Sequence, residues 1–191
     1  ELLFIERCLS LLKPGGRMGI VLPEGVYNNP SLAYVRQFAE DRAKISAIIS
    51  MPQDTFVSAK AFVKTSLLFM QKFTEEESKK WLGLLDQKQN EILAKQKKER
   101  EALGEILKDR KAGKEKKKKA KAKLKELDDF AQSESRRLAR ADFDYPIFMC
   151  EAERVGISST GEEDKNELPQ ILEEYAKFQK DPKNYGRNTR K

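Results

Sequence analysis

The chain of 191 residues contains no histidine. This absence excludes Ser-His-Asp and Cys-His catalysis, and every zinc site with a histidine ligand, from what these residues could do alone. Its two cysteines, Cys8 and Cys150, lie far apart and form no Cys-x-x-Cys pair, which is typical of reduced thiols in a cytoplasmic protein. No apolar run reaches about 18 residues, so we expect no membrane span.

Apolar residues are also scarce, at 39% of the chain, whereas charged residues make up 36%. This balance predicts a modest core together with a long solvated part. The net charge of +7 permits an acidic polymer as a partner. Residues 75–140 hold 21 Lys and Arg against 14 Asp and Glu, a surplus that equals the whole net charge of the chain.

Residues 1–74 combine helical and strand patterns, and we interpret them as an α/β region. A helical pattern begins the chain and ends at Pro14, and a continuous apolar run over residues 18–22 then predicts a buried strand over residues 17–22. Asn29 and Pro30 look like the N-cap and first residue of a second helix. Residues 45–51 and 66–72 are the next predicted strands.

The connections between these strands predict their directions. The first two are joined through a helix and should be parallel, with a right-handed crossover. Residues 52–64 show no helical stripe, so the third strand should run antiparallel to both. Because three strands and two helices cannot bury a large core, we interpret this region as the last part of a larger doubly wound sheet.

Residues 75–141 form a second, basic region. It has no proline up to residue 140 and contains many good helix formers, with a break expected around Gly113. Sparse apolar stripes predict an antiparallel helical hairpin, similar to a coiled coil, with a thin seam. The stripe consists of Trp81, Leu85, Ile92, Leu103 and Ile106 in the first arm, and of Leu124, Ala131 and Leu138 in the second.

A run of four lysines, residues 116–119, follows the break in the hairpin. The run could bind phosphates, or it could be the solvated tip of the hairpin. The residues alone favour the solvated tip slightly, because no aromatic residue is interleaved with the lysines.

Residues 142–191 return to a mixed composition and form the third region, a C-terminal helical segment and tail. We expect a short helix over residues 145–156 that ends at Gly156, and a loop over residues 158–166. An amphipathic helix begun by Pro169 should follow, and residues 181–191 look like a frayed tail.

The loop over residues 52–64 carries two aromatic rings, Phe56 and Phe62, together with Lys60 and Lys64. An aromatic ring that stacks a base, beside lysines that meet phosphates, would suit nucleic-acid binding. The alternative, which the residues alone favour, is that both rings pack against the edge of the sheet.

Two short motifs resemble a dinucleotide-binding loop and a methyltransferase tetrapeptide, but each lacks a feature that the known motif requires. The glycines of Gly15-Gly16-x-x-Gly19 follow a helix and precede a strand, the reverse of the order in a dinucleotide-binding loop. Asn29-Pro30-Ser31-Leu32 lacks the second proline and the aromatic residue of the tetrapeptide found in amino-group methyltransferases.

Four stretches together resemble a known family. They are LFIERCLSLLKPGGRMGIVLPEGVYNN, ISAIISMPQDTFVSAKAFVKTSLLFMQK, YPIFMCEAERVGISSTG and NELPQILEEYAKF. In this order they are similar to the methylation subunit of type I restriction–modification systems, which are N6-adenine DNA methyltransferases that use S-adenosylmethionine. The similarity covers most of residues 2–74 and 145–178 and leaves residues 75–140 as a helical insertion.

The resemblance implies a fold and a position within it. The predicted strands 17–22, 45–51 and 66–72 would be the fifth, sixth and seventh strands of a Rossmann-like methyltransferase sheet, with the seventh antiparallel between the other two. The family's glycine-containing cofactor loop and its catalytic tetrapeptide are not in this chain. We therefore expect a C-terminal portion that is inactive alone and has no catalytic, cofactor-binding or metal-ligating residue, with S-adenosylmethionine bound by a preceding part.

The resemblance also implies partners and site residues. DNA and the specificity and restriction subunits of a type I complex would be the partners, in the cytoplasm and without a membrane. Phe56 would lie over the target base, with Phe62 as the second choice, and Lys60 and Lys64 would hold the DNA backbone. Two alternatives stay open, a non-enzymatic nucleic-acid- or protein-binding scaffold that uses the basic hairpin, and a small-molecule methyltransferase.

Overall fold

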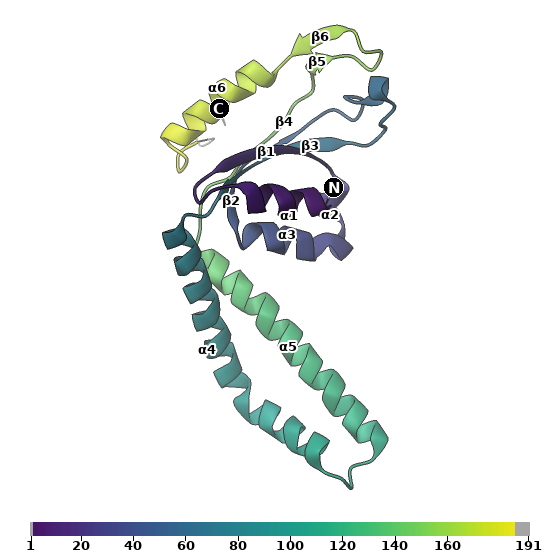
Figure 1. The fold of residues 1–191 in the computed structure, drawn as a ribbon, viewed down its shortest axis with the longest axis vertical. Helices are drawn as coiled ribbons and strands as arrows, with labels where there is room; N and C mark the ends of the chain where they lie inside the picture. The colour runs from purple at the N-terminus through teal and green to yellow at the C-terminus, as the bar shows by residue number, and fades with distance from the viewer. Residues whose placement is uncertain (1, 186–191) are drawn as a thin grey trace. The chain divides into compact units, whose positions relative to one another are not determined.

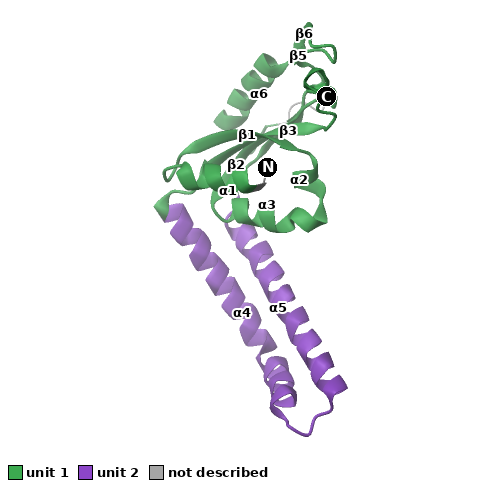
Figure 2. Cartoon of the chain, turned by 45° about the vertical axis from the view of Figure 1, so that its right-hand side comes forward, with its two compact units in different colours: residues 1–75, 145–191 green, residues 76–144 purple. Residues whose placement is uncertain are grey.

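The computed structural model describes residues 2–185 and divides the chain into two compact units (Figure 2). The first unit combines Glu1–Glu75 with Tyr145–Lys191, and the second is Glu76–Asp144. Within the described residues, no helix is both long and apolar enough to cross a membrane.

A four-stranded sheet forms the centre of the first unit, in the order β1-β3-β2-β4. These strands are β1 (Arg17–Pro23), β3 (Thr65–Lys72), β2 (Ala43–Ser50) and β4 (Phe148–Glu151). The strand β3 lies between β1 and β2 and is antiparallel to both, while β4 pairs with β2 in parallel. The predicted antiparallel direction of the third strand is therefore confirmed, and so is the common direction of the first two.

Helices α1 (Leu2–Leu11) and α3 (Ala33–Glu40) cover one face of this sheet (Figure 1). Short turns, α2 (Gly25–Asn28) and η1 (Pro30–Leu32), connect β1 to α3, and Asn29 Oδ1 accepts a hydrogen bond from Ser31 N as the predicted cap. The main core lies between these helices and the sheet. It consists of Ile5, Leu9, Leu22, Val26, Val35, Ala39, Ala43, Leu68 and Met70.

The end of α1 is held by a lysine from the sheet. Lys72 Nζ donates hydrogen bonds to Leu9 O at 2.8 Å and to Leu12 O at 2.7 Å. A cation at this place suits the partial negative charge of a helix C-terminus. Gly15 has a φ of 74°, a left-handed conformation that favours glycine, so the predicted stop of the helix is confirmed.

Helix α6 (Leu168–Lys180), the predicted amphipathic helix, covers the other face beside β4. Its Phe178 packs against Phe148 of β4 with ring centroids 5.5 Å apart. Tyr175 and Tyr185 complete the aromatic cluster, with centroids 5.4 Å and 5.8 Å from Phe148. Tyr185 thus packs against this cluster although it lies in the segment predicted to fray, and the end of that segment, 186–191, lies outside the described residues.

Two predictions in this part of the chain are wrong. Residues 145–156, predicted as a helix, instead hold β4 and the start of β5 (Val155–Ile157). Residues 158–166, predicted as a loop, contain β6 (Glu163–Asn166), which pairs with β5. The physical reason is non-local, because pairing with β2 satisfies the backbone of β4 and buries Phe148, and such contacts override local preference.

The second unit consists of two long helices, α4 (Glu75–Lys108) and α5 (Lys114–Asp142), as the sequence predicts. Only two side chains of α4 are buried, those of Trp81 and Ile92. The buried residues of α5 are Ala120, Leu127, Ala131, Ser135 and Ala139. The stripe on α5 therefore differs from the prediction, because Leu124 and Leu138 are only half-buried while smaller residues lie in the seam.

Polar and aromatic contacts join the two helices along this thin seam. Trp81 packs against Phe143 with ring centroids 5.7 Å apart. Ion pairs connect Lys88 to Asp142 at 2.7 Å and Arg100 to Asp128 at 2.6 Å.

Candidate site at the carboxyl edge of the sheet

One edge of the sheet gathers the carboxyl ends of three strands and the beginning of the fourth. Pro23 at the end of β1 lies opposite Thr65, the first residue of β3. Ser50 at the end of β2 lies between Ser66 and Glu151 on its two neighbours. Ligands of open α/β sheets bind outside the carboxyl ends of the strands, so we take this edge as the candidate site.

Glu24, the residue after β1, connects two of these strand ends. Its Oε1 accepts a hydrogen bond from Ser50 Oγ at 3.2 Å and another from Ser66 Oγ. The Ser66 side chain is fully buried, and the backbone N–H of Glu24 donates to Lys64 O at 2.9 Å. Because Ser50 and Ser66 lie near the two ends of the loop 52–64, this cluster holds the base of that loop in place.

Two buried hydroxyl groups at the same edge have no hydrogen-bond partner among the described residues. They belong to Tyr27 of α2 and to Thr65. Burial, and secondarily the charge of Glu24, raises the pKa of Tyr27 far above its ordinary value. Tyr27 therefore keeps its proton at neutral pH, and its hydroxyl remains a neutral hydrogen-bonding group.

An ion pair lies beside this cluster, between Lys64 Nζ and Glu151 Oε1 at 2.7 Å. The hydrogen bond to Glu151 raises the pKa of Lys64, and the same bond lowers the pKa of Glu151. Both groups are charged at neutral pH. The pair links the end of the loop 52–64 to the end of β4.

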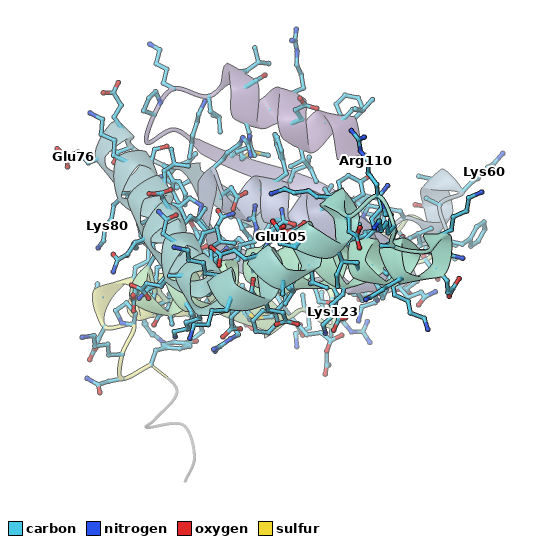
Figure 3. The ribbon with its side chains drawn as sticks, turned by 90° about the horizontal axis from the view of Figure 1, so that it is seen from below. Lys60, Glu76, Lys80, Glu105, Arg110 and Lys123 are labelled. Carbon is cyan, nitrogen blue, oxygen red and sulfur yellow. The ribbon has the colours of Figure 1, made fainter. Side chains whose placement is uncertain are left out.

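All four predicted site residues lie on the loop 52–64 at this edge. Phe56 is half-buried and precedes the short turn η2 (Val57–Ala59), while Phe62 exposes 69% of its surface. Lys60 is exposed and extends away from the ribbon, with a φ of 63° (Figure 3). Lys64 differs from the other three, because its ammonium group already pairs with Glu151.

The turn of the β5–β6 hairpin braces the loop from outside. Gly161 has a φ of 89°, and a Cβ atom there would lie 3.2 Å from Ser58 Cβ. Only glycine allows this close approach together with this backbone conformation.

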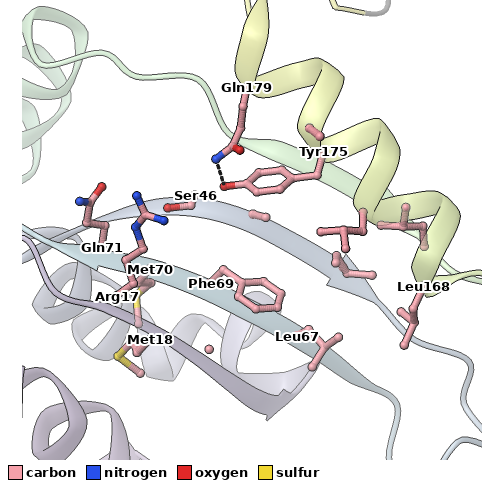
Figure 4. A pocket seen from close by; sticks show the side chains of 16 residues that line it. Arg17, Met18, Ser46, Leu67, Phe69, Met70, Gln71, Leu168, Tyr175 and Gln179 are labelled. Atoms are coloured by element: carbon pink, nitrogen blue, oxygen red, sulfur yellow. Dashed lines mark hydrogen bonds between the residues drawn. The ribbon is translucent and has the colours of Figure 1, made fainter.

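A separate groove lies on the sheet face that α6 partly covers (Figure 4). Its volume is about 660 Å³, and Leu67, Phe69 and Ile49 form part of its apolar lining. Arg17 and Gln71 are its polar residues at the ends of β1 and β3 away from the carboxyl edge. The lining contains no carboxylate, thiol or histidine, and its hydroxyl groups are those of Ser46 and of Tyr175, which accepts a hydrogen bond from Gln179 Nε2 at 3.0 Å.

Sequence reasoning did not identify Glu24, Ser50, Ser66 or Tyr27. The sequence does contain a signal for three of these site residues. Glu24 and Ser50 come at the carboxyl ends of predicted strands, and Ser66 begins one. What the sequence could not supply was the register that places Ser66 opposite Ser50, and the side-chain geometry that brings both hydroxyl groups to Glu24.

The comparison with protein families matches residues 1–144, three quarters of the chain, to the sequence model described as N-6 DNA Methylase. The chain belongs to the N-6 DNA methylase family. This membership agrees with the α/β sheet and the long helices of the structure.

Solved structures of two other proteins show partial similarity. One is described as a class I S-adenosylmethionine-dependent methyltransferase of Listeria monocytogenes, 28% identical over 39% of this chain and 22% of that chain, with a TM-score of 0.34. The other, from a study of the assembly and conformational transition of a type I R-M system, is 32% identical over 37% of this chain and 15% of that chain, also with a TM-score of 0.34. The chain thus spans less than a quarter of the length of either. No match was found among curated proteins.

In this member of the N-6 DNA methylase family, the glycines of Gly15-Gly16-x-x-Gly19 lead into a strand and do not open a helix. Gly15, Gly16 and Gly19 lie in the turn after α1 and at the start of β1, and Gly19 approaches Phe69 rather than open space. No group of three or more metal-ligating side chains occurs within residues 2–185. Cys8 and Cys150 are both free thiols, and burial raises the pKa of Cys150.

Proposed function

We propose that this chain supplies the C-terminal part of the catalytic domain of an adenine-N6 DNA methyltransferase, the methylation subunit of a type I restriction–modification complex. The observation that carries this proposal is the match of residues 1–144 to the N-6 DNA methylase family. The position of β3, antiparallel between β1 and β2, supports it, because the resemblance in the sequence implies this arrangement for the fifth, seventh and sixth strands.

The loop 52–64 is the part of this chain that we assign to the target base. A methyltransferase that modifies an adenine amino group must extrude the base from the duplex, and the extruded base needs a stacking surface. The loop lies at the carboxyl edge and offers the rings of Phe56 and Phe62. Phe62 has the more exposed ring, whereas the half-buried Phe56 has the better fixed one.

The lysines of the loop would contact the DNA backbone. Lys60 is exposed and makes no ion pair in the described structure, so its ammonium group is available to a phosphate. Lys64 would have to exchange Glu151 for a phosphate, or else hold the loop against β4 in the complex. We therefore assign the stronger phosphate contact to Lys60.

Binding of S-adenosylmethionine is assigned to residues outside this chain, because the glycines present here do not fit a cofactor loop. The chain alone should then bind no S-adenosylmethionine and methylate no DNA. The DNA sequence would be read by a separate specificity subunit, and a restriction subunit would complete the complex.

The test is methylation by the full-length protein assembled with its specificity subunit. Transfer of an isotopically labelled methyl group to duplex DNA, followed by mass spectrometry of the nucleosides, should identify N6-methyladenine as the product. A matched duplex with purine in place of the target adenine lacks the 6-amino group and should accept no methyl group. Methylation of cytosine, or equal methylation of the purine duplex, would contradict the proposal.

A further inference from the structure

Basic residues concentrate around the connection between α4 and α5. We define the basic tip as residues 108–125, which hold 11 of the 38 Lys and Arg residues but only two of the 31 Asp and Glu residues. Ten of these eleven basic side chains are exposed, and Lys117 is half-buried. Without the basic tip, the rest of the chain would be slightly acidic.

The body of the same hairpin balances its charges, whereas the basic tip does not. In the body, basic side chains pair across the seam, as Arg100 does with Asp128, or along a helix, as Arg137 does with Glu134. In the basic tip, the structure shows ion pairs for only two basic residues, Lys108 with Glu105 and Lys123 with Glu126. The other nine make no ion pair in the described structure. A surface that only contacts solvent would not require unpaired basic residues to be concentrated in the basic tip.

The lysines of α5 form two rows, one on the face away from its buried seam and one beside the seam. At 100° per residue, Lys114, Lys118, Lys121 and Lys125 lie on the face of α5 away from the seam residues Ala120 and Leu127, and Lys116, Lys119 and Lys123 lie beside the seam. The first row is about 16 Å long at 1.5 Å per residue. Like charges at i,i+4 repel one another, so the lysines within each row repel. Binding of an anionic partner would reduce this repulsion.

The composition of the basic tip decides which polyanion it suits. It contains no aromatic residue and no Asn, Gln, Ser or Thr, so it lacks most of the side chains that read base edges or stack unpaired bases. Lysine is also depleted in protein–protein interfaces, which use aromatic residues and arginine. A surface made almost only of lysine fits the phosphate backbone of a duplex, which binds through charge and without sequence preference.

We propose that the basic tip binds the phosphate backbone of duplex DNA, independently of base sequence. The choice of DNA rests on the proposed function of the chain. The binding itself requires neither the loop 52–64 nor a target adenine. It would add affinity and salt dependence to the complex without adding sequence recognition.

The experiment measures DNA binding by the 191-residue chain through fluorescence anisotropy. The probe is a labelled 30-base-pair duplex made only of G·C pairs, which contains no adenine, compared with a duplex of mixed sequence. We expect equal affinity for the two duplexes and a steep fall in affinity between 50 and 200 mM salt. Failure of the proposed function would appear in the methylation assay and would leave this binding unchanged.

The deciding variant changes Lys114, Lys118, Lys121 and Lys125 to Gln together. It should bind at least tenfold more weakly at 100 mM salt and reduce the slope of log K against log salt by about 3.6, which is about 0.9 for each of four lost phosphate contacts. The matched control changes four exposed lysines of α4 to Gln, namely Lys79, Lys95, Lys97 and Lys98, and should lose much less affinity. Circular dichroism of both variants checks that the helices remain.

Three outcomes would overturn the proposal. The first is equal loss of affinity in the two variants, which would mean that net charge alone matters. The second is wild-type binding by the variant of the basic tip. The third is tighter binding of single-stranded RNA or of a polyglutamate peptide than of the duplex, which would assign the surface to a different class of partner.

Discussion

The carboxylate of Glu24 accepts a hydrogen bond from the hydroxyl of the fully buried Ser66, and so connects the end of β1 to the start of the antiparallel strand β3. Ser50, at the end of β2, donates to the same carboxylate oxygen. The three residues come from positions far apart in the sequence and meet below the loop 52–64. Their geometry therefore fixes where the loop leaves and re-enters the sheet.

Ser66→Ala should destabilise the chain by about 1–3 kcal/mol, because it removes a buried donor from a charged acceptor. Urea unfolding measures the loss, and hydrogen exchange should show faster exchange in the amides of residues 52–64. Ser10→Ala is the matched control, since Ser10 is exposed on α1. If the two variants unfold alike and the loop exchanges at its original rate, the Glu24 cluster does not position the loop.

The strand pair β1–β3 contains a second specific contact, in which Gly19 leaves room for the ring of Phe69 directly opposite. A Cβ atom at Gly19 would lie 2.9 Å from Phe69 Cε1. Gly19→Ala should therefore cost about 1–3 kcal/mol by overpacking, measured by urea unfolding. The cost should fall in a Phe69→Leu background, while Gly25→Ala, which meets nothing within 4 Å, should be nearly neutral. An equal cost in both backgrounds would show that the ring is not the obstacle.

These contacts show which parts of the structure the sequence could predict. The continuous apolar run at Met18–Leu22 predicted the position of β1, but its burial on both faces was predicted wrongly, because only Leu22 is buried and Val21 exposes 44% of its surface. The four-residue strand β4 was missed, because pairing with β2, about a hundred residues earlier, provides its stabilisation. The residue types of the loop with Phe56 and Phe62 indicated two alternatives, and the role at the target base came from the family resemblance and stays a prediction. The Glu24 cluster was missed, because strand order alone does not give the register and the side-chain contacts that join its three members.

The ion pair between Lys64 and Glu151 should give a defined pH dependence. The folded-state pKa of Glu151 is lowered, so its stabilising contribution is present above the unfolded value of about 4.5 and is lost as the pH falls through the folded value. The pKa of Lys64 is raised, so its contribution is present below about 10.5 and is lost as the pH rises through the folded value. A carboxyl NMR titration should place the midpoint of Glu151 below 4.5.

The variant Lys64→Gln tests the cause of this shift. The midpoint of Glu151 should rise toward its ordinary value, because the hydrogen bond from the ammonium group is lost. Glu134, whose pKa is lowered by Arg137 in the hairpin, is the internal control and should titrate as before. An unchanged midpoint of Glu151 in this variant would contradict the assigned pair.

The two aromatic rings of the loop 52–64 make the most direct prediction about function. In the full-length assembled enzyme, Phe56→Ala should slow methylation by one to two powers of ten, because stacking on an aromatic ring contributes about 1–3 kcal/mol and about 1.4 kcal/mol corresponds to each tenfold. Phe56→Trp should be much milder, because it keeps an aromatic face. Single-turnover methylation measures the rate, and S-adenosylmethionine affinity should stay nearly unchanged.

Parallel variants distinguish the two rings from each other and from a general surface effect. If Phe62→Ala slows methylation and Phe56→Ala does not, the exposed ring stacks the base and the half-buried ring only packs in the loop. Phe130→Ala is the control, because Phe130 exposes 53% of its surface and belongs to helix α5 of the second unit. A fluorescent base analogue at the target position reports stacking directly, since its quenching should disappear only with the loss of the stacking ring. Wild-type rates in both loop variants, or losses explained entirely by unfolding, would show that the target base stacks elsewhere.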